Sequence, residues 1–548
     1  MKKITGKGVY GAVAIGAVSV YRRQGANVQK TRIDDPEAEI RRVKAATELA
    51  QRQLTEVYEK AVGELGKTDA QIFEIHRMML EDADYSGSIE ELIRSDLVNA
   101  EYAVSVTSER FAEMFASMDN AYMQARAADV RDVSNRLIAC LTGDAVETAK
   151  SPEKIILCAD DLAPSETVAL DKERVAAFVT AFGSSNSHTA ILARNMTIPA
   201  VIGAGEKFLE TVRDGSTLIV DGHTGDLIID PDEKTLRAYF VRQQEDARKK
   251  EMLRSLKGKP NVTRDGREIG IFANIGGVDG VDAALANDAG GIGLFRSEFL
   301  FLESDGYPTE EEQFTIYKQV LERMKGRKVI IRTLDIGADK QVGYFGLDKE
   351  ENPALGLRAI RICLTRPELF RKQLRALYRA SAYGNLGIMF PMIVSVREVE
   401  QCLATCALVR QELKAEGIPF SDSVELGIMI ETPAAAIISD RLAPMVDFFS
   451  IGTNDLTQYT LACDRQNPRL EAFADPHYEA VLRLIELTVK NAHAHGTWVS
   501  ICGELAADTS LTETFLRIGI DELSVSAPFV LAVRDAVRAL DLSDAPQQ

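Results

Sequence analysis

Basic, acidic, amide and thiol side chains follow several short apolar segments in the second half of the chain, where strands are expected to end. They are Arg296, Arg332, Glu431, Asn454, Asp455 and Cys502, and the loops after two segments add Arg358, Arg361 and Arg465. Arginines gathered at one place repel one another unless an anion lies between them, and guanidinium groups match carboxylate and phosphate oxygens. Glu431 and Asp455 amid this positive charge indicate a hard cation such as Mg²⁺. We therefore expect a small ligand that carries phosphate and carboxylate groups and binds with magnesium.

A second candidate centre is His188, which follows the stretch Gly183-Ser-Ser-Asn-Ser187 and lies at the start of a predicted helix over 187–195. Free backbone N–H groups and the helix dipole favour negative charge at a helix start, so they would stabilise a phosphate on the imidazole. A histidine that caps the helix or packs against it is the alternative.

Each of these residues alone also fits a structural role. A single arginine or glutamate at a strand end is commonly part of an ion pair, and an isolated Cys502 is commonly a buried apolar thiol. The same chemical theme at five strand ends favours a functional site.

The elements that position these residues alternate between strand and helix from residue 260 to 548. Strands are predicted at 269–275, 290–296, 329–335, 386–393, 424–431, 447–453, 497–503 and 521–526, with helices such as 309–324, 367–382, 396–416 and 475–495 between them. Eight such units are typical of a (β/α)8 TIM barrel, whose chemistry lies at the C-terminal ends of the strands. A doubly wound open sheet is the structural alternative.

The first half of the chain predicts a β/α domain with an inserted helical bundle. Residues 1–31 and 152–230 read as strands and helices, with strands at 154–158 and 175–180 and a hairpin at 217–221 and 226–229. The segment between them has little Gly or Pro and predicts helices at 37–65, 68–82, 86–99 and 101–139. The expected domains are a β/α domain (1–31 plus 143–231), a bundle (32–142), a linker helix (232–259) and the barrel (260–548).

Composition excludes several classes of protein. The 548 residues carry a net charge of −18, which disfavours nucleic-acid binding. Seven scattered cysteines without CxxC spacing indicate a reducing, cytoplasmic setting. Lys2 and Lys3 precede a short apolar stretch, but its glycines and the lack of a clean cleavage site argue against a signal peptide. No apolar run is long enough to span a membrane, so no membrane insertion is expected.

Several longer motifs contain these residues. They are Ser450-Ile-Gly-Thr-Asn-Asp-Leu-Thr-Gln-Tyr459, Gly293-Leu-Phe-Arg-Ser-Glu-Phe-Leu-Phe301, Asn352-Pro-Ala-Leu-Gly-Leu-Arg-Ala-Ile-Arg361, Ser187-His-Thr-Ala-Ile-Leu-Ala-Arg194, Pro164-Ser-Glu-Thr167 and Ala121-Tyr-Met-Gln-Ala-Arg-Ala-Ala-Asp-Val-Arg-Asp132. Over essentially the whole chain, this combination resembles Enzyme I of the bacterial phosphoenolpyruvate:sugar phosphotransferase system, a family of phosphoenolpyruvate-protein phosphotransferases.

The resemblance implies a complete reaction. His188 would accept the phosphoryl group of phosphoenolpyruvate on Nε2, with Thr167 beside it, and would pass it to the carrier protein HPr for sugar uptake. Cys502 would protonate the enolate carbon to give pyruvate, since a thiol is a competent acid near neutral pH. The resemblance assigns substrate binding to Arg296, Arg332, Arg358, Asn454, Asp455 and Arg465, and Mg²⁺ binding to Glu431 and Asp455. It also implies a homodimer joined through the barrel.

Two other functions fit parts of the sequence. A pyruvate phosphate dikinase or phosphoenolpyruvate synthase shares these modules but needs a nucleotide-grasping domain, which the helical insert is too short to supply. A phosphoenolpyruvate-sensing scaffold would not need His188 and Cys502. One departure stands out, since Ser184-Ser185-Asn186 replaces the Gly, basic residue and Thr that the family usually has before Ser-His. The sequence does not indicate which sugars lie downstream.

Overall fold

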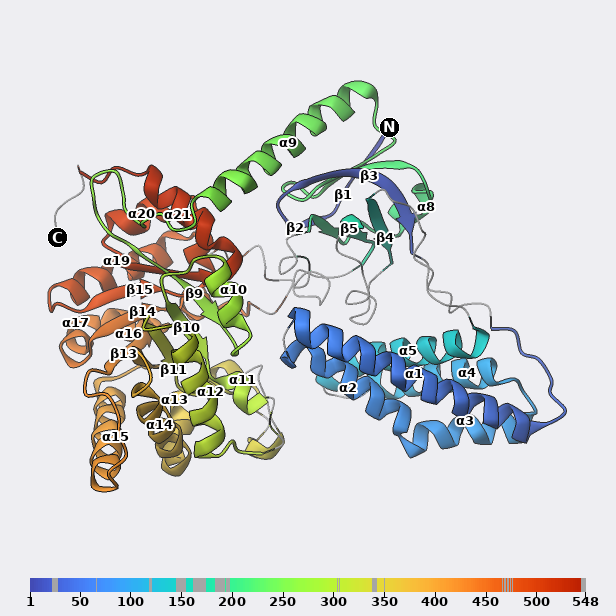
Figure 1. Cartoon of the computed structure of the whole chain (residues 1–548), viewed down its shortest axis with the longest axis horizontal. Coiled ribbons are helices and arrows are strands. Elements are labelled where there is room, and N and C mark those ends of the chain that lie inside the picture. Colours follow the sequence, from blue (N-terminus) through green and yellow to red (C-terminus); the bar gives the residue numbers. More distant parts are fainter. Residues whose placement is uncertain are drawn as a thin grey trace. The chain divides into compact units, whose positions relative to one another are not determined.

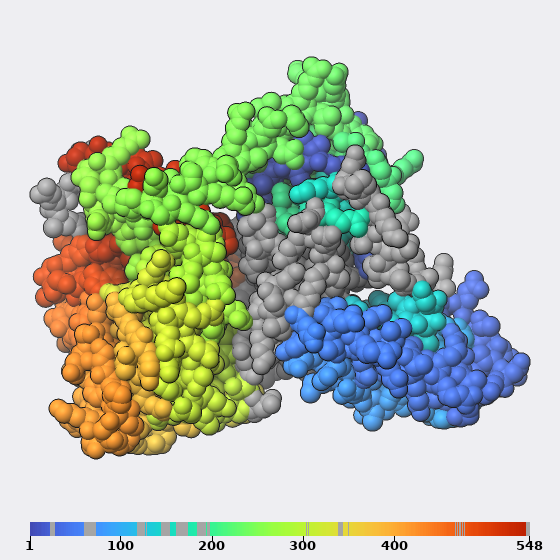
Figure 2. Space-filling model, in the orientation of Figure 1, coloured from blue at the N-terminus to red at the C-terminus, as the bar shows by residue number. Residues whose placement is uncertain are grey.

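A computed structural model describes residues 1–21, 28–65, 67–117, 121–143, 154–160, 174–182, 193, 198–302, 304, 306–337, 343–348, 350–465, 467, 470, 473, 475 and 477–543. The chain forms two compact units, Met1–Lys250 and Glu251–Gln548. The other residues are grey in Figures 1 and 2. His188, Thr167 and, apart from Ala193, the predicted helix 187–195 lie outside the described residues.

The second unit is a closed barrel of eight parallel strands in the order β10-β11-β12-β13-β14-β15-β16-β9 (Figure 1). The predicted fold class is therefore confirmed, and the open-sheet alternative is wrong. The strands are β9 Gly270–Ile275, β10 Ile292–Arg296, β11 Val329–Arg332, β12 Leu386–Phe390, β13 Glu425–Ile430, β14 Phe448–Ile451, β15 Trp498–Ile501 and β16 Glu522–Ser526. Five of them, β11 to β15, end earlier than predicted on the C-terminal side.

Helices surround the barrel, and local signals in the sequence define where several of them begin. Thr309 and Glu312 form a capping box at α12, as Ser395 and Glu398 do at α15, and Pro367 occupies the first turn of α14. The helices are α10 Gly280–Ala286, α11 Glu298–Leu302, α12 Glu310–Arg323, α13 Ile360–Thr365, α14 Pro367–Ser381, α15 Val396–Ala415, α16 Pro433–Ile437, α17 Ser439–Leu442, α18 Thr453–Leu461, α19 Glu479–His493, α20 Thr512–Arg517 and α21 Val530–Ala539.

The first unit contains an eight-stranded sheet that combines the beginning of the chain with residues 155–229. Its order is β1-β8-β7-β3-β4-β5-β6-β2. Strand β3 pairs antiparallel with β7 and parallel with β4, so the residues between β3 and β4 are inserted into the sheet's sequence. The strands are β1 Lys2–Thr5, β2 Lys7–Tyr10, β3 Val13–Val20, β4 Ile155–Ala159, β5 Val175–Thr180, β6 Ala200–Ile202, β7 Thr217–Asp221 and β8 Asp226–Ile229, with helix α8 Glu206–Thr211 after β6.

The inserted segment is a bundle of helices, and one predicted helix in it is wrong. The helices are α1 Pro36–Leu65, α2 Lys67–Glu81, α3 Ala83–Asp96, α4 Ala100–Ala116 and α5 Ala121–Thr142. The single helix expected over 101–139 is thus two helices, α4 and α5. The Arg131 guanidinium donates to both carboxylate oxygens of Glu109 at 3.0 and 3.1 Å, which requires the chain to reverse between them. The stretch 117–120 holds Ser, Asp and Asn, which favour turns, but helix-forming residues on both sides obscured that signal.

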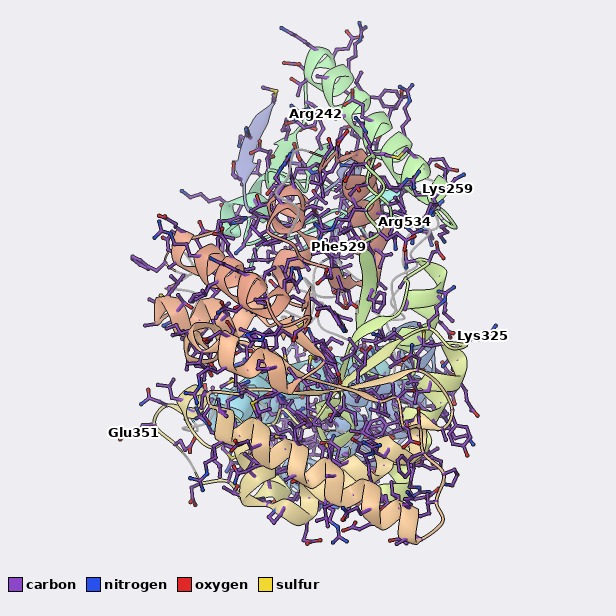
Figure 3. The ribbon with its side chains drawn as sticks, turned by 90° about the vertical axis from the view of Figure 1, so that its left-hand side faces the viewer. Arg242, Lys259, Lys325, Glu351, Phe529 and Arg534 are labelled. Atoms are coloured by element: carbon purple, nitrogen blue, oxygen red, sulfur yellow. The ribbon has the colours of Figure 1, made fainter. Side chains whose placement is uncertain are left out.

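Helix α9 (Glu233–Ser255) spans the boundary between the two units, and contacts at residues 246 and 256 attach this part of the chain to each of them. In the first unit, Asp246 accepts a hydrogen bond from the Val13 backbone at 2.9 Å. In the second, Arg534 of α21 is 2% exposed (Figure 3) and donates to the Leu256 carbonyl at 2.9 Å and to Asp288 at 2.6 Å. No helix in the described part of the chain is both long and apolar enough to cross a membrane.

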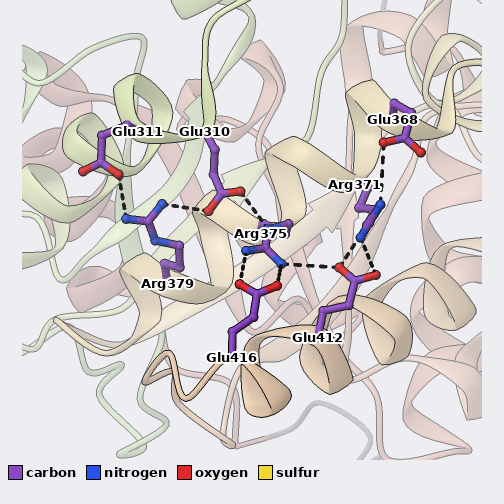
Figure 4. Close-up of polar contacts among 8 residues, drawn as sticks. All are labelled: Glu310, Glu311, Glu368, Arg371, Arg375, Arg379, Glu412 and Glu416. Atoms are coloured by element: carbon purple, nitrogen blue, oxygen red, sulfur yellow. Dashed lines mark hydrogen bonds and ion pairs between the residues drawn. The ribbon is translucent and has the colours of Figure 1, made fainter.

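An ion-pair network joins three barrel helices (Figure 4). Arg375 of α14 lies at its centre and pairs with Glu310 of α12 at 2.7 Å and with Glu416, just after α15, at 2.7 Å. Its side chain is only 14% exposed, so these pairs are screened less than surface pairs.

We expect Arg375→Gln to destabilise the barrel by roughly 1–2 kcal/mol, because one guanidinium holds carboxylates from two neighbouring segments. Calorimetry should show the barrel transition about 2–4 °C lower. Arg410→Gln, which removes one exposed pair with Asp422, is the matched control and should change it by less than a degree or so. An equal fall in the barrel's transition temperature for the two variants would show that the network does not stabilise the barrel.

Glu522 gives the barrel a pH-dependent stability. It is 4% exposed at the start of β16, and no described residue bonds to its Oε1. Burial raises the pKa of Glu522 to about 8; Lys328 opposes this rise, and Glu425 and Asp521 add to it. A raised carboxyl pKa means that the folded state favours the protonated form, so stability declines as pH rises through 8.

The free energy of unfolding of the wild type should therefore fall by up to about 3 kcal/mol between pH 6 and pH 9, and Glu522→Gln should remove this fall. The difference in barrel melting temperature between the two proteins, measured by calorimetry, should grow over this range and then level off. Glu486→Gln, at an exposed position on α19, should show no such trend. A constant difference across pH would disprove the buried titration.

Candidate active site

The closed parallel barrel brings the C-terminal strand ends to one rim, and the predicted barrel residues lie there. Arg296 and Arg332 are the last residues of β10 and β11, and Glu431 directly follows β13. Asn454 and Asp455 lie in the first turn of α18 after β14, while Cys502 directly follows β15. Apolar residues fill the barrel beneath them: Leu294, Ile330, Met389, Met429 and Phe448. The rim is therefore a polar surface on a closed apolar floor.

Asp335 connects two buried arginines at this rim. Its carboxylate accepts a bond from Arg332 at 3.0 Å and another from Arg358 at 3.0 Å. Arg332 also donates to Glu298 at 2.5 Å. Burial alone would lower the pKa of both guanidinium groups, but the surrounding carboxylates raise it, Asp335 contributing most. Both arginines are thus fixed in position and fully charged.

Arg296 differs, because its side chain is open to solvent. Protein atoms nevertheless surround it closely, and the resulting desolvation, together with the positive charges of Arg332 and Arg465, lowers its pKa. No described residue forms an ion pair with Arg296 or Arg465 in this structure, so these two guanidinium groups are available to an anion.

Arg358 extends the charged network to the acidic pair. Its guanidinium donates to Asp455 at 3.5 Å and to the Tyr459 hydroxyl at 3.0 Å, in addition to Asp335. Arg358 is 4% exposed, and three partners already occupy it. The structure therefore favours a supporting role for Arg358, whereas Arg296 and Arg465 are better placed for direct contact.

Glu431 is completely buried beside these charges. It accepts a hydrogen bond from the Met392 backbone N–H at 2.5 Å, while no described residue bonds to its other oxygen, Oε2. Burial and the negative charges of Asp455 and Asp335 raise the pKa of Glu431 to about 8, against the effect of Arg332 and Arg358. A bare carboxylate held this way is incomplete without a cation or proton.

Backbone strain and close approaches occur around the same carboxylates. Met392 and Ala359, which neighbours Arg358, adopt positive φ angles of 57° and 53°. Such conformations are costly for residues with side chains and concentrate at functional sites. Glycine is required at two positions, since a Cβ on Gly452 would lie 2.8 Å from Glu431 Oε2, and one on Gly503 would lie 1.9 Å from Thr453 Oγ1.

Asn454 and Cys502 complete the rim. The Asn454 side-chain oxygen accepts from the Glu504 backbone N–H at 3.1 Å, which orients its NH2 group as the remaining donor. Burial raises the pKa of the Cys502 thiol to about 11, although Ser450 lowers it. The thiol therefore stays protonated near neutral pH, as a proton donor must.

Comparisons with known proteins agree with this geometry. The family described as "PEP-utilising enzyme, PEP-binding domain" matches residues 250–542. Those described as "PEP-utilising enzyme, N-terminal" and "PEP-utilising enzyme, mobile domain" match residues 5–126 and 151–225. The phosphoenolpyruvate-protein phosphotransferase of Priestia megaterium is 44% identical over 99% of this chain and 95% of its own. That of Bacillus subtilis (strain 168) is 43% identical over 100% of this chain and 96% of its own.

This chain belongs to the phosphoenolpyruvate-protein phosphotransferase family. An Enzyme I protein whose structure was solved by NMR is 36% identical and covers 44% of this chain and 99% of its own, with a TM-score of 0.39.

The PEP-utilising family requires a divalent metal, and the rim fits one. The described residues contain no cluster of three or more His, Cys, Asp or Glu side chains that would enclose a metal by themselves. Mg²⁺ does not need such a cluster, because it commonly binds through one or two carboxylates together with substrate phosphate and water. The unbonded Glu431 Oε2 and the neighbouring Asp455 match that requirement.

The sequence placed Asp335 and Glu298 near strand ends and Tyr459 in a motif but gave them no role, and it misplaced Arg361. Asp335, Glu298 and Tyr459 fix the arginines, yet as single polar residues near strand ends or in helices they carry no distinguishing signal. The spacing of Asp335, three residues after Arg332, was the available hint. Arg361 does not reach the rim and donates instead to the Leu355 and Gly356 carbonyls at 2.8 and 2.7 Å, which shapes its own loop.

Asp335→Asn should weaken phosphoenolpyruvate binding by at least about tenfold, because an amide offers one acceptor oxygen and turns its NH2 group toward a guanidinium. Isothermal titration with Mg²⁺ present measures this. The control is Asp282→Asn, which removes the partner of Arg323 on the outer helices and should leave affinity unchanged. A folded Asp335→Asn protein with wild-type affinity would show that the bridge does not prepare the site.

Proposed function

We propose that this protein transfers the phosphoryl group of phosphoenolpyruvate to His188, releases pyruvate, and passes the phosphoryl group to HPr. The observation that carries the proposal is the barrel rim, where no described residue pairs with the exposed Arg296 and Arg465 or bonds to Oε2 of the buried Glu431. A small anion with two charged groups would bind the arginines, and a divalent cation would bind the carboxylate. The match over nearly the full length of two phosphoenolpyruvate-protein phosphotransferases supports the same reaction.

The geometry supports the following roles. Arg296, Arg332 and Arg465 bind the phosphate and carboxylate, Asn454 donates a further hydrogen bond, and Arg358 supports Asp335 and Asp455. Glu431 and Asp455 would hold Mg²⁺, which supplies neutralisation of phosphoryl charge when bound. Arginines fixed in advance stabilise the charge that develops on the transferred group without having to reorganise.

The chemistry balances with the residues available. The bond between phosphorus and the enol oxygen breaks as a bond forms between phosphorus and His188 Nε2. The enolate carbon takes the proton of the Cys502 thiol to give pyruvate, and the thiolate regains a proton from solvent. A thiol with a raised pKa remains loaded with its proton between turnovers.

His188 must then leave the barrel and meet HPr. We place His188 and Thr167 in the β/α domain, the HPr contact on the bundle, and the homodimer contact on the barrel. Helix α9 is fixed at Asp246 in one unit and near Leu256 in the other. We therefore place the swing between the two units in the short segment between these residues.

The decisive experiment uses phosphoenolpyruvate labelled on phosphorus. Wild-type protein with Mg²⁺ should become labelled in an acid-labile form and should pass the label to added HPr. His188→Ala should still bind phosphoenolpyruvate, because the barrel is intact, but should take up no label.

His223→Ala, which changes an exposed histidine of the same unit, is the matched control and should be labelled normally. Full labelling of the His188→Ala protein would move the acceptor to another histidine, His76 being the next to test. Wild-type protein that binds phosphoenolpyruvate without becoming labelled would identify a sensing scaffold instead.

A further inference from the structure

A histidine outside the rim connects two of the loops that build it. His477 lies just before α19, and Asp508 directly follows the 3-10 turn Glu504–Ala507, which begins two residues after Cys502. His477 Nε2 lies 2.8 Å from Asp508 Oδ2, and His477 Nδ1 lies 2.8 Å from Asp475 Oδ1. We propose that His477 is a positioning residue whose protonated ring holds the Cys502–Asp508 turn in its substrate-binding arrangement.

Only the imidazolium can make both contacts. A neutral imidazole has one N–H donor and one acceptor nitrogen, so one of the two carboxylates would face a lone pair. The imidazolium donates from both nitrogens and joins Asp475 to Asp508. Its hydrogen bonds to Asp475 and then Asp508 raise the pKa of His477, and these two carboxylates are the charged groups that act on it.

The Cys502–Asp508 turn, held at Asp508, affects the rim through two residues, Asn454 and Cys502. Asp508 also accepts from the Ser510 backbone at 2.9 Å and from its hydroxyl at 2.6 Å, so its carboxylate is fixed on both sides. At the other end of the turn, the Glu504 N–H orients the Asn454 amide at 3.1 Å. Displacement of the turn would therefore disturb both the Asn454 donor and the thiol of Cys502.

The sign of the pH effect follows from the raised pKa. The double contact is complete at pH values below the pKa of folded His477 and is lost as pH rises through it. Because the His477 side chain is 45% exposed, each contact is individually weak. The proposal rests on the proposed function for its effect on substrate, but not for the contact itself.

The test measures phosphoenolpyruvate affinity with Mg²⁺ for wild type, His477→Gln and His477→Arg from pH 6 to pH 9. We expect His477→Gln to bind about three- to tenfold more weakly than wild type at pH 6, with the ratio falling toward one at pH 9 as the wild type loses its charge. His477→Arg keeps two donors and a charge at every pH, so its affinity should not fall relative to wild type as pH rises.

His493→Gln is the matched control, since His493 contacts Asp521 at 3.0 Å near the opposite ends of the strands and should give a ratio of one throughout. A His477→Gln ratio that does not change with pH would overturn the proposal. An independent NMR titration of the His477 ring separates this failure from failure of the proposed function. It needs no substrate, and an ordinary histidine pKa that Asp508→Asn leaves unchanged would also overturn the contact.

Discussion

Two guanidinium groups buried side by side at the barrel rim are the constraint on which the rest of the site depends. Buried cations are tolerated only with close counter-charges, and Asp335 provides one carboxylate to both Arg332 and Arg358. Arg358 in turn contacts Asp455, so the anion-binding and cation-binding halves of the rim share a single network. Burial, together with the negative charges of Asp455 and Asp335, outweighs the effect of Arg332 and Arg358 and raises the pKa of Glu431. Under the proposed function, phosphoenolpyruvate and a divalent cation would complete this network of charges.

The backbone around this network is constrained as closely as the side chains. Met392 adopts a positive φ and turns its N–H toward Glu431, and Ala359 adopts one beside Arg358. Gly452 and Gly503 allow segments to approach where any side chain would collide. The barrel beneath, with its apolar interior and its outer helices joined through Arg375, supplies the rigidity that keeps such conformations in place. The strained backbone at the rim thus depends on the stability of the barrel that carries it.

The sequence predicted the barrel well, because strands and helices alternate there with regular spacing and clear caps, such as Thr309 with Glu312. It also placed Arg296, Arg332, Glu431 and Cys502 at strand ends, where the structure has them. It failed between α4 and α5, since the few turn-favouring residues at 117–120 lie between two strongly helix-forming segments and were read as part of one long helix. It could not assign Asp335 or His477 a role, because each also bonds a residue distant in sequence, Arg358 and Asp508 respectively. The sequence does not distinguish an arginine that contacts the substrate from one that supports neighbouring residues or its own loop, as Arg358 and Arg361 show.

The interleaved sheet of the first unit has a consequence for synthesis on the ribosome. Strand β1 pairs only with β8, and β2 only with β6, so the first strands to emerge wait until residues 200–229 have been made. The bundle between β3 and β4 has all of its helices within residues 36–142 and can fold during that interval. Once folded, it replaces a long flexible loop by a compact connection and lowers the entropy lost when β3 meets β4. The folded insert thus lowers the entropic cost of closing the sheet that surrounds it in the sequence.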